Sequence, residues 1–233
     1  MSGDWYTLDE LAEHLGRDRR ELERLANRGR LPGHKRSGTW QFHAAEITQW
    51  LEQEMREYSD AQLAAVEKSQ RSVELDAAVP VSSLLSLETV QVPLDARTKR
   101  SLLESLIEVA GRTWKIWQPA AILKAVQERE ELMSTAFAHG VALPHPRQPL
   151  PDAMSDSVVA FGRTLGGIPF GAPDNLSTDL FFLVLCRDTR THLHVLARLG
   201  RLIQSPGFVA GLRDAPNARI AYDWIVDADQ KIG

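Results

Sequence analysis

The spacing of apolar positions separates a small N-terminal part of the chain from a larger C-terminal part. In the first sixty residues the spacing is helical three times, and it predicts helices at about 8–15, 19–27 and 44–58. Thr7 or Asp9 is placed to cap the first helix, and Gly16 permits a tight turn after it. The stretch HKRSGTWQF between the second and third helices predicts a short hairpin with basic residues at its tip. The N-terminal part is therefore expected to be small and mostly helical.

The C-terminal part alternates between helical spacing and short apolar runs. Helices are predicted at 98–111, 119–131, 191–204 and near 217–227. Strand-like runs lie between them in VALPH, SVVAFGRT and FFLVLC, and the last is apolar throughout, as a buried central strand would be. This order predicts an α/β domain, a mixed sheet flanked by helices.

Residues 59–80 have the composition of a linker, without aromatic side chains and rich in alanine, serine and charge. The first half of this stretch can also prolong the third helix, and Pro80 is expected to end it. The sequence therefore predicts an N-terminal domain over 1–58, a linker over 59–80 and a second domain over 81–233 with its own core.

Composition excludes several classes of protein. With 43% hydrophobic and 25% charged residues, the chain is expected to fold as a globular protein. No apolar run approaches the roughly 18–20 residues that cross a bilayer, and the start of the chain has no signal-peptide pattern. Cys186 is the one cysteine, which excludes an internal disulfide and disfavours a cysteine-based metal site. We therefore expect a cytoplasmic protein with no membrane partner.

Charge is distributed unevenly along the chain, although the total is only −4. Residues 17–36 contain eight lysine and arginine side chains against three acidic ones, a local balance of +5. A clustered basic surface is typical of proteins that bind the phosphate backbone of nucleic acids. A helix face that is simply solvated is the alternative interpretation.

The order helix–turn–helix–wing–helix over residues 5–53 resembles the excisionase/MerR type of winged helix-turn-helix domain. The resemblance is carried by YTLDELAEHLG, the basic second helix, GRLPGHKRSGTWQF and AAEITQWL. Such domains place the second helix in the major groove and the wing along the backbone or minor groove, so the implied partner is double-stranded DNA. The implied DNA-contacting residues are Arg19, Arg20 and Arg24 of the helix and His34, Lys35 and Arg36 of the wing.

Two acidic residues depart from this pattern. Asp18 and Glu21 open the second helix, where small or hydroxylated residues are commoner, and their charge would repel phosphate. A surface for protein partners therefore stays open as an alternative to DNA. Trp40 is expected to pack the wing onto the core rather than to contact DNA.

A second motif ends on a histidine in the C-terminal part. Residues 129–145 read REELMSTAFAHGVALPH, with an Arg-Glu pair, a Ser-Thr pair, a glycine and an apolar–Ala–apolar–Pro–His ending. Further on, DTRTHLHVLARL supplies another histidine after the buried strand. Together the two stretches resemble enzyme IIA of the phosphotransferase system, of the mannitol, fructose and nitrogen-regulatory type, over about 81–228. The resemblance implies a phosphoryl group carried on His145 and a histidine phosphocarrier protein as its donor.

The residues of these motifs suit phosphoryl transfer. A neutral imidazole nitrogen is a good nucleophile toward phosphorus near neutral pH, and the rest of the site must position and neutralise the phosphoryl oxygens. Arg129 is expected to pair with these oxygens, and Ser134 and Thr135 to donate hydrogen bonds to them. The resemblance implies that His192 lies beside His145.

Structural roles remain open for some of these residues. Arg129 can instead pair with a neighbouring glutamate, and Ser134 and Thr135 can cap a helix. His194 lies two residues after His192 in a predicted helix and is therefore expected to point elsewhere.

No metal ion is expected, since the histidines lack the spacing of a zinc site, and no cofactor is expected either. A hydrolase triad is disfavoured because no G-x-S-x-G motif is present. The resulting hypothesis is a cytoplasmic regulator that accepts a phosphoryl group on His145 and couples it to DNA binding, acting as a phosphohistidine carrier rather than a turnover enzyme. A homo-oligomer is compatible with it. The alternatives are a transport component that passes phosphate to an enzyme IIB, and a regulator that acts through protein partners without DNA.

Overall fold

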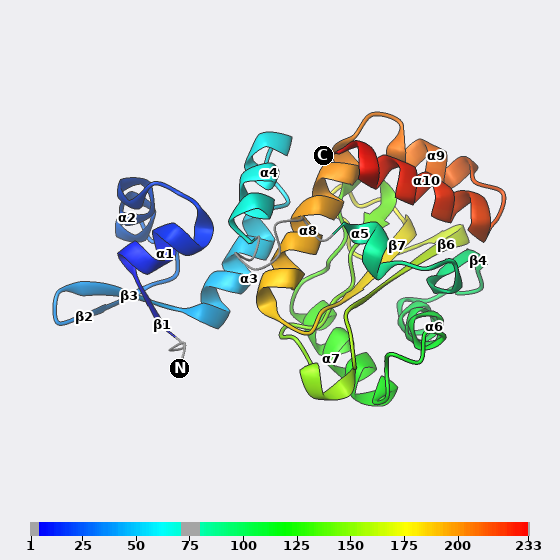
Figure 1. Cartoon of the computed structure of the whole chain (residues 1–233), viewed down its shortest axis with the longest axis horizontal. Coiled ribbons are helices and arrows are strands. Elements are labelled where there is room, and N and C mark those ends of the chain that lie inside the picture. Colours follow the sequence, from blue (N-terminus) through cyan, green and yellow to red (C-terminus); the bar gives the residue numbers. More distant parts are fainter. Residues whose placement is uncertain (1–4, 71–79, 233) are drawn as a thin grey trace. The chain divides into compact units, whose positions relative to one another are not determined.

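The computed structural model describes residues 5–70 and 80–232, which belong to two compact units (Figure 1). The N-terminal unit is Met1–Ala78 and the C-terminal unit is Val79–Gly233. Much of the second half of the predicted linker, residues 71–79, lies outside the described residues. Within the described parts of the chain, no helix combines the length and apolar character needed to cross a membrane.

The N-terminal unit is helical with one small antiparallel sheet, as the sequence predicts. Its elements are β1 (Trp5–Thr7), α1 (Leu8–Leu15), α2 (Arg19–Asn27), β2 (His34–Arg36), β3 (Thr39–His43), α3 (Ala44–Glu54) and α4 (Asp60–Ser69). The sheet order is β1-β3-β2. Strand β1 has no counterpart among the predicted elements, since three residues are too few to show a period.

Local hydrogen bonds set the limits of these helices. The Thr7 side chain caps α1, and Gly16 ends it in the left-handed conformation, with φ of 61°. Asp18 caps α2 by accepting from the backbone N–H groups of Arg20 (2.9 Å) and Glu21 (3.1 Å). Asp18, one of the two acidic residues that depart from the family pattern, thus stabilises the start of α2.

The third helix is shorter than predicted. The sequence indicates a helix from 44 to 58, but α3 ends at Glu54. Ser59 begins a separate helix, because its backbone N–H and its hydroxyl both donate to Oε1 of Gln62 at 3.0 Å. The first half of the predicted linker therefore forms α4 and does not prolong α3.

The C-terminal unit is a mixed α/β fold. Its helices and turns are α5 (Val81–Leu84), η1 (Leu87–Thr89), α6 (Lys99–Gly111), α7 (Pro119–Leu132), η2 (Ala138–Gly140), η3 (Pro151–Ala153), α8 (Thr189–Gln204), α9 (Phe208–Asp214) and α10 (Ala218–Lys231). Its strands are β4 (Val90–Leu94), β5 (Val141–Ala142), β6 (Val158–Ile168) and β7 (Thr178–Leu185). The four predicted helices are present, whereas β4 and α9 were not predicted.

The sheet has the order β4-β6-β7-β5, with β6 and β7 antiparallel and each outer strand parallel to its neighbour. Alternate residues of the central strands face opposite layers. Val158 and Ala160 of β6 join the apolar cluster that α6 and α7 contribute to. Phe161, which points to the opposite face, packs against Phe182 with ring centroids 4.7 Å apart and ring planes inclined at 46°. The run FFLVLC therefore lies in a central strand that is buried on both faces, as predicted.

A buried ion pair joins α8 to α10. The guanidinium of Arg198, 5% exposed, pairs with the carboxylate of Asp229, which is fully buried. Arg198 also donates to the Asp229 carbonyl at 2.6 Å, and the second carboxylate oxygen accepts from the backbone N–H of Ser82 at 2.8 Å. Three segments that are distant in sequence therefore meet at one carboxylate.

Candidate phosphoryl-accepting site

His145 follows β5, the two-residue strand at the edge of the sheet. The chain beyond β5 stays attached to β7, because the N–H of Val184 donates to the carbonyl of Pro144 at 2.9 Å. Nδ1 of His145 lies 2.7 Å from the carbonyl oxygen of Leu143. A carbonyl oxygen only accepts hydrogen bonds, so this contact assigns the proton to Nδ1 and leaves the lone pair on Nε2.

His192 lies beside His145, as the resemblance implies. The two ring centroids are 5.0 Å apart, with the ring planes inclined at 60°. His192 belongs to the first turns of α8, whose N-terminus is capped by Asp188 through the backbone N–H of Thr191 at 2.8 Å. The buried strand β7 and the capped start of α8 thus bring the second histidine to the first.

The segment before His145 is held at one end by Glu130. Its buried carboxylate accepts from the backbone N–H of Thr135 (3.0 and 3.1 Å) and from the Thr135 hydroxyl (2.5 Å). The ammonium of Lys99 lies 2.8 Å from the same carboxylate. This role of Glu130 was not predicted from the sequence, where Glu130 was considered only as a possible partner of Arg129. The one signal that could have indicated the role is the position of Glu130 in the Arg-Glu pair of the motif.

The turn in the middle of this segment is held by Arg213 of α9. Its guanidinium donates to both oxygens of Asp179 (2.7 and 2.8 Å) and to the carbonyl of His139 (2.5 Å). The hydrogen bond to Asp179 raises the pKa of the Arg213 guanidinium. No sequence signal points to Arg213, which lies far along the chain in a helix that was not predicted.

Asp174 supports the same turn from another side. Its carboxylate accepts from the backbone N–H groups of Leu176 and His139, each at 3.0 Å. These two bonds, that from Leu176 first, lower the pKa of Asp174.

Gly140 is required where it stands. Its φ is 76°, in the left-handed region, and a Cβ there would lie 2.5 Å from Nη2 of Arg213 and 2.8 Å from Oδ1 of Asp179. The glycine of the motif therefore permits both the turn and the close approach of the Arg213–Asp179 pair.

The other three predicted phosphoryl ligands have protein partners. Arg129 is buried in α7, 1% exposed, and its Nη1 donates to the carbonyl of Met133 at 2.9 Å. The Ser134 hydroxyl donates to the carbonyl of Phe170 at 2.6 Å, and the Thr135 hydroxyl donates to Glu130. In this structure these side chains hold the segment that leads to His145, and their contact with a phosphoryl group stays a prediction.

The predicted DNA-contacting residues of α2 differ in their surroundings. Arg19 is occupied by acidic partners, Asp9 at 2.6 Å and Glu23 at 3.5 Å. Arg20 and Arg24 are exposed, and within residues 5–70 no carboxylate forms an ion pair with either. Helix α2 therefore has two exposed arginines that form no ion pair with residues 5–70.

The wing is a hairpin of β2 and β3 that turns at Ser37 and Gly38, both with positive φ. Its cations lie against aromatic rings: Lys35 Nζ is 4.9 Å from the Trp40 ring centre, and the guanidinium carbon of Arg36 is 4.4 Å from that of Trp5. His34 contacts Glu46 at 2.9 Å. Trp40 also stacks on the buried Phe42, with ring centroids 6.1 Å apart, as its predicted packing role requires.

Comparison with known families agrees with both parts of the chain. Residues 83–227 match the family described as "Phosphoenolpyruvate-dependent sugar phosphotransferase system, EIIA 2". Residues 5–55 match a family described as "Helix-turn-helix domain". Because the first match spans more than half of the sequence, the chain belongs to the EIIA type 2 family, with a helix-turn-helix domain at its N-terminal end. Both family resemblances are confirmed at this level.

Known relatives cover about two thirds of the chain. A "Nitrogen regulatory protein" of Escherichia coli (strain K12) is 29% identical over 156 residues, which are 66% of this chain and 94% of the relative. A "PTS system fructose-specific EIIA component" of Haloferax volcanii is 28% identical over 149 residues, 63% of this chain and 95% of the relative.

Solved structures show the same fold. The nitrogen regulatory protein IIA-Ntr from Neisseria meningitidis superposes with a TM-score of 0.54 at 24% identity, covering 62% of this chain and 98% of that one. A complex of enzyme IIA and phosphorylated enzyme IIB for mannitol from Escherichia coli gives 0.52 at 17% identity, covering 62% and 99%. At these identities the likeness concerns the fold alone.

Proposed function

We propose that this member of the EIIA type 2 family accepts a phosphoryl group on Nε2 of His145 from a histidine phosphocarrier protein. The observation that supports the proposal is the 2.7 Å contact between Nδ1 and the Leu143 carbonyl, which leaves the Nε2 lone pair for attack on phosphorus. In the transfer, the bond between phosphorus and the donor's nitrogen breaks as the Nε2–P bond forms.

His192 and Arg129 are proposed to act on the phosphoryl oxygens. The 5.0 Å between the two ring centroids supports contact of His192 with a group on His145. The role of Arg129 is proposed from its place in the Arg-Glu pair of the motif that ends on His145. For Ser134 and Thr135 we propose a contribution through the segment that their hydroxyls hold.

Labelling with phosphoenolpyruvate, enzyme I and a phosphocarrier tests this proposal. The full chain is expected to take up one phosphoryl group that is labile in acid and stable in base, and His145→Ala is expected to take up none. His192→Ala is expected to be labelled more slowly, since one hydrogen bond to a charged group contributes roughly 1.5–3 kcal/mol. Undiminished labelling of His145→Ala would contradict the assignment.

For the N-terminal unit we propose binding to double-stranded DNA, with α2 entering the major groove and the wing following the backbone. Arg20 and Arg24 of the helix and Lys35 and Arg36 of the wing are the proposed contacts that the structure leaves exposed, while Arg19 and His34 have acidic partners. The whole chain would then be a cytoplasmic regulator whose phosphorylation state is read out at DNA.

A transport component is the second candidate. A solved structure of similar fold contains enzyme IIA with a phosphorylated enzyme IIB, which favours a hand-over of phosphate in that protein. Adding an enzyme IIB to the labelled chain separates the two functions. Rapid and complete transfer to the IIB protein, together with no DNA binding, would favour transport.

A further inference from the structure

The carboxylate of Glu130 is an unusual group to find beside a phosphoryl-accepting site, because it is negatively charged and its side chain is only 2% exposed. Burying a carboxylate is costly unless hydrogen bonds and a cation compensate for the lost water. Here the compensation is complete: two donors from Thr135 and the ammonium of Lys99. Such an arrangement holds Thr135 firmly relative to α7.

Thr135 is in turn hydrogen-bonded to the segment that leads to His145. Its carbonyl accepts from the N–H of Leu143 at 3.1 Å, and the N–H of Phe137 donates to the carbonyl of Val141 at 2.7 Å. Between these two bonds, Ala136 and Ala142 form an antiparallel bridge. Residues 135–137 and 141–143 are therefore a small ladder, fixed at its base by Glu130.

The backbone carbonyl of Leu143 contacts the His145 ring. The N–H of Leu143 is bonded to Thr135, while its carbonyl is the group that lies 2.7 Å from Nδ1 of His145. One peptide segment thus connects the buried carboxylate to the imidazole ring. The direction of the Leu143 carbonyl decides which ring nitrogen carries the proton.

We propose that Glu130 is a positioning residue that fixes the tautomer of His145 through Thr135 and Leu143. This inference rests on the proposed function for its consequence, since only the tautomer with a proton on Nδ1 has its lone pair on Nε2, the atom proposed to attack phosphorus. If Glu130 no longer holds Thr135, the ladder shifts and the Leu143 carbonyl releases Nδ1. The ring then also populates the tautomer with the proton on Nε2, in which the lone pair lies on Nδ1 and Nε2 cannot attack phosphorus.

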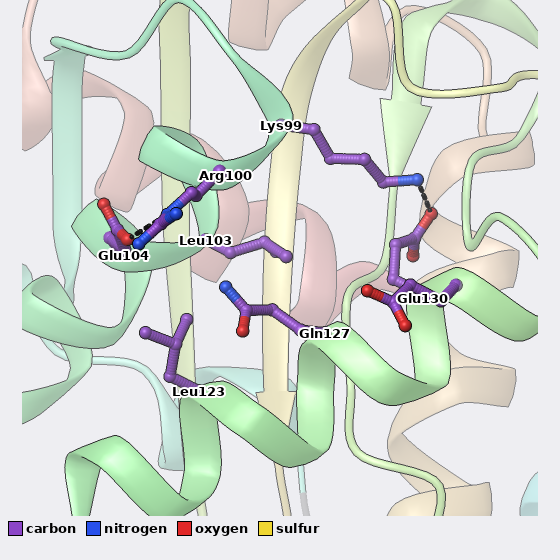
Figure 2. A pocket seen from close by; sticks show the side chains of 8 residues that line it. Lys99, Arg100, Leu103, Glu104, Leu123, Gln127 and Glu130 are labelled. Carbon is purple, nitrogen blue, oxygen red and sulfur yellow. Dashed lines mark hydrogen bonds and ion pairs between the residues drawn. The ribbon is translucent and has the colours of Figure 1, made fainter.

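Lys99, at the surface, supplies the cation that pairs with the Glu130 carboxylate. A crevice of about 480 Å³ between α6 and α7 is lined by Lys99, Gln127, Glu130 and the apolar Leu103, and the lysine side chain is 38% exposed there. Figure 2 shows Lys99 extending from the start of α6 to the Glu130 carboxylate. The lysine therefore balances the buried charge from a position that solvent reaches.

Nitrogen-15 NMR of the His145 ring in the full, unphosphorylated chain tests the inference without any phosphoryl transfer. The unaltered chain is expected to show one tautomer, with the proton on Nδ1. Glu130→Gln is expected to show a mixture of tautomers, and its labelling rate is expected to fall about ten- to a hundredfold, the effect of one lost hydrogen bond to a charged group. Glu131→Gln is the matched control, because it removes the same charge from the next, exposed position and is expected to change neither.

Thr135→Val and Thr135→Ser give a second test that does not depend on how well Glu130→Gln folds. The valine variant keeps the shape but loses the hydroxyl donor, and it is expected to mix the tautomers, while the serine variant restores a single tautomer and the rate. A single tautomer in both Glu130→Gln and Thr135→Val would overturn the inference, even with slower labelling. Failure of the unaltered chain to accept phosphate would contradict the proposed function and leave the tautomer measurement valid.

Discussion

The two units hold their functional side chains in opposite ways. In the N-terminal unit, Arg20 and Arg24 extend into solvent from one short helix, and Lys35 and Arg36 lie on a wing of two short strands. In the C-terminal unit, His145 ends a segment that Glu130 fixes at its start, Thr135, and that Arg213 fixes at its turn, His139. Exposed cations act nearly independently, so their loss reduces binding in small steps. A segment that several hydrogen bonds fix to distant parts of the chain responds to a single change as a whole.

The largest expected effect concerns the buried pair of Arg198 and Asp229. Arg198→Ala leaves a fully buried carboxylate without its cation, and we expect a loss of about 3–5 kcal/mol in the free energy of unfolding. Arg219→Ala is the control, since it removes an exposed pair with Asp223 four residues on and is expected to cost under about 0.5 kcal/mol. Urea denaturation of both variants measures the difference, and equal losses would contradict the comparison of buried with exposed charge.

The next effect compares two glycines that both have positive φ. Gly140→Ala combines backbone strain with displacement of Arg213, and we expect it to cost about 2–4 kcal/mol and to slow the labelling of His145. Gly38→Ala, with φ of 81° at the wing turn, meets no atom within 4 Å and should cost only the strain, about 1–2 kcal/mol. Similar thermal stability and similar labelling in the two variants would show that the Arg213–Asp179 pair does not hold the turn.

A smaller effect is expected when exposed cations are removed from the N-terminal unit. DNA affinity should fall steeply with salt, because each phosphate contact releases counterions. Replacing both Arg24 and Lys35 with alanine should flatten the slope of log affinity against log salt by roughly one unit per lost contact. Fluorescence anisotropy with labelled duplex DNA measures this slope. An unchanged slope would remove these two residues from the proposed DNA surface.

The smallest effect distinguishes two adjacent arginines. Arg19 is already engaged by Asp9 and Glu23, whereas Arg20 pairs with no carboxylate of the described N-terminal residues. We therefore expect Arg20→Ala to weaken DNA binding more than Arg19→Ala does, by about 1 kcal/mol or less. The same anisotropy titration at low salt resolves the difference, and the reverse order would indicate that Arg19 leaves its acidic partners to bind phosphate.

Much of the fold could be predicted because the periodic segments are long. The helices α6, α7, α8 and α10 and the central strand β7 all lie where the apolar spacing placed them. Elements that depend on tertiary contacts were missed, such as β4, which pairs with β6, and the short helix α9. The end of α3 was predicted too late, at residue 58, because the apolar spacing does not reveal that Ser59 caps a separate helix.

The site was predictable only in part, for a related reason. The two histidine motifs allowed His145 and His192 to be named as candidates, and their rings are adjacent in the structure. Residues that hold the motif in place come from elsewhere in the chain, as Lys99 and Arg213 do, and single-sequence patterns do not connect them. The hydroxyls of Ser134 and Thr135 bond to Phe170 and Glu130 in this structure, and their expected contact with the phosphoryl group stays a prediction.

We propose that phosphoryl acceptance on His145 and DNA binding by the N-terminal unit are coupled within one chain. Phosphorylation adds a charge of about −1.5 to −2, and it changes DNA affinity only if it favours one arrangement of the units or one oligomer over another. The decisive measurement is the affinity for promoter DNA, as a function of salt, of the phosphorylated chain, the unmodified chain and His145→Ala treated with the same phosphorylating enzymes. We predict a change equivalent to roughly 1–3 kcal/mol on phosphorylation, in either direction, that is absent from His145→Ala. Equal affinities and equal salt slopes for the phosphorylated and unmodified chains would contradict the account.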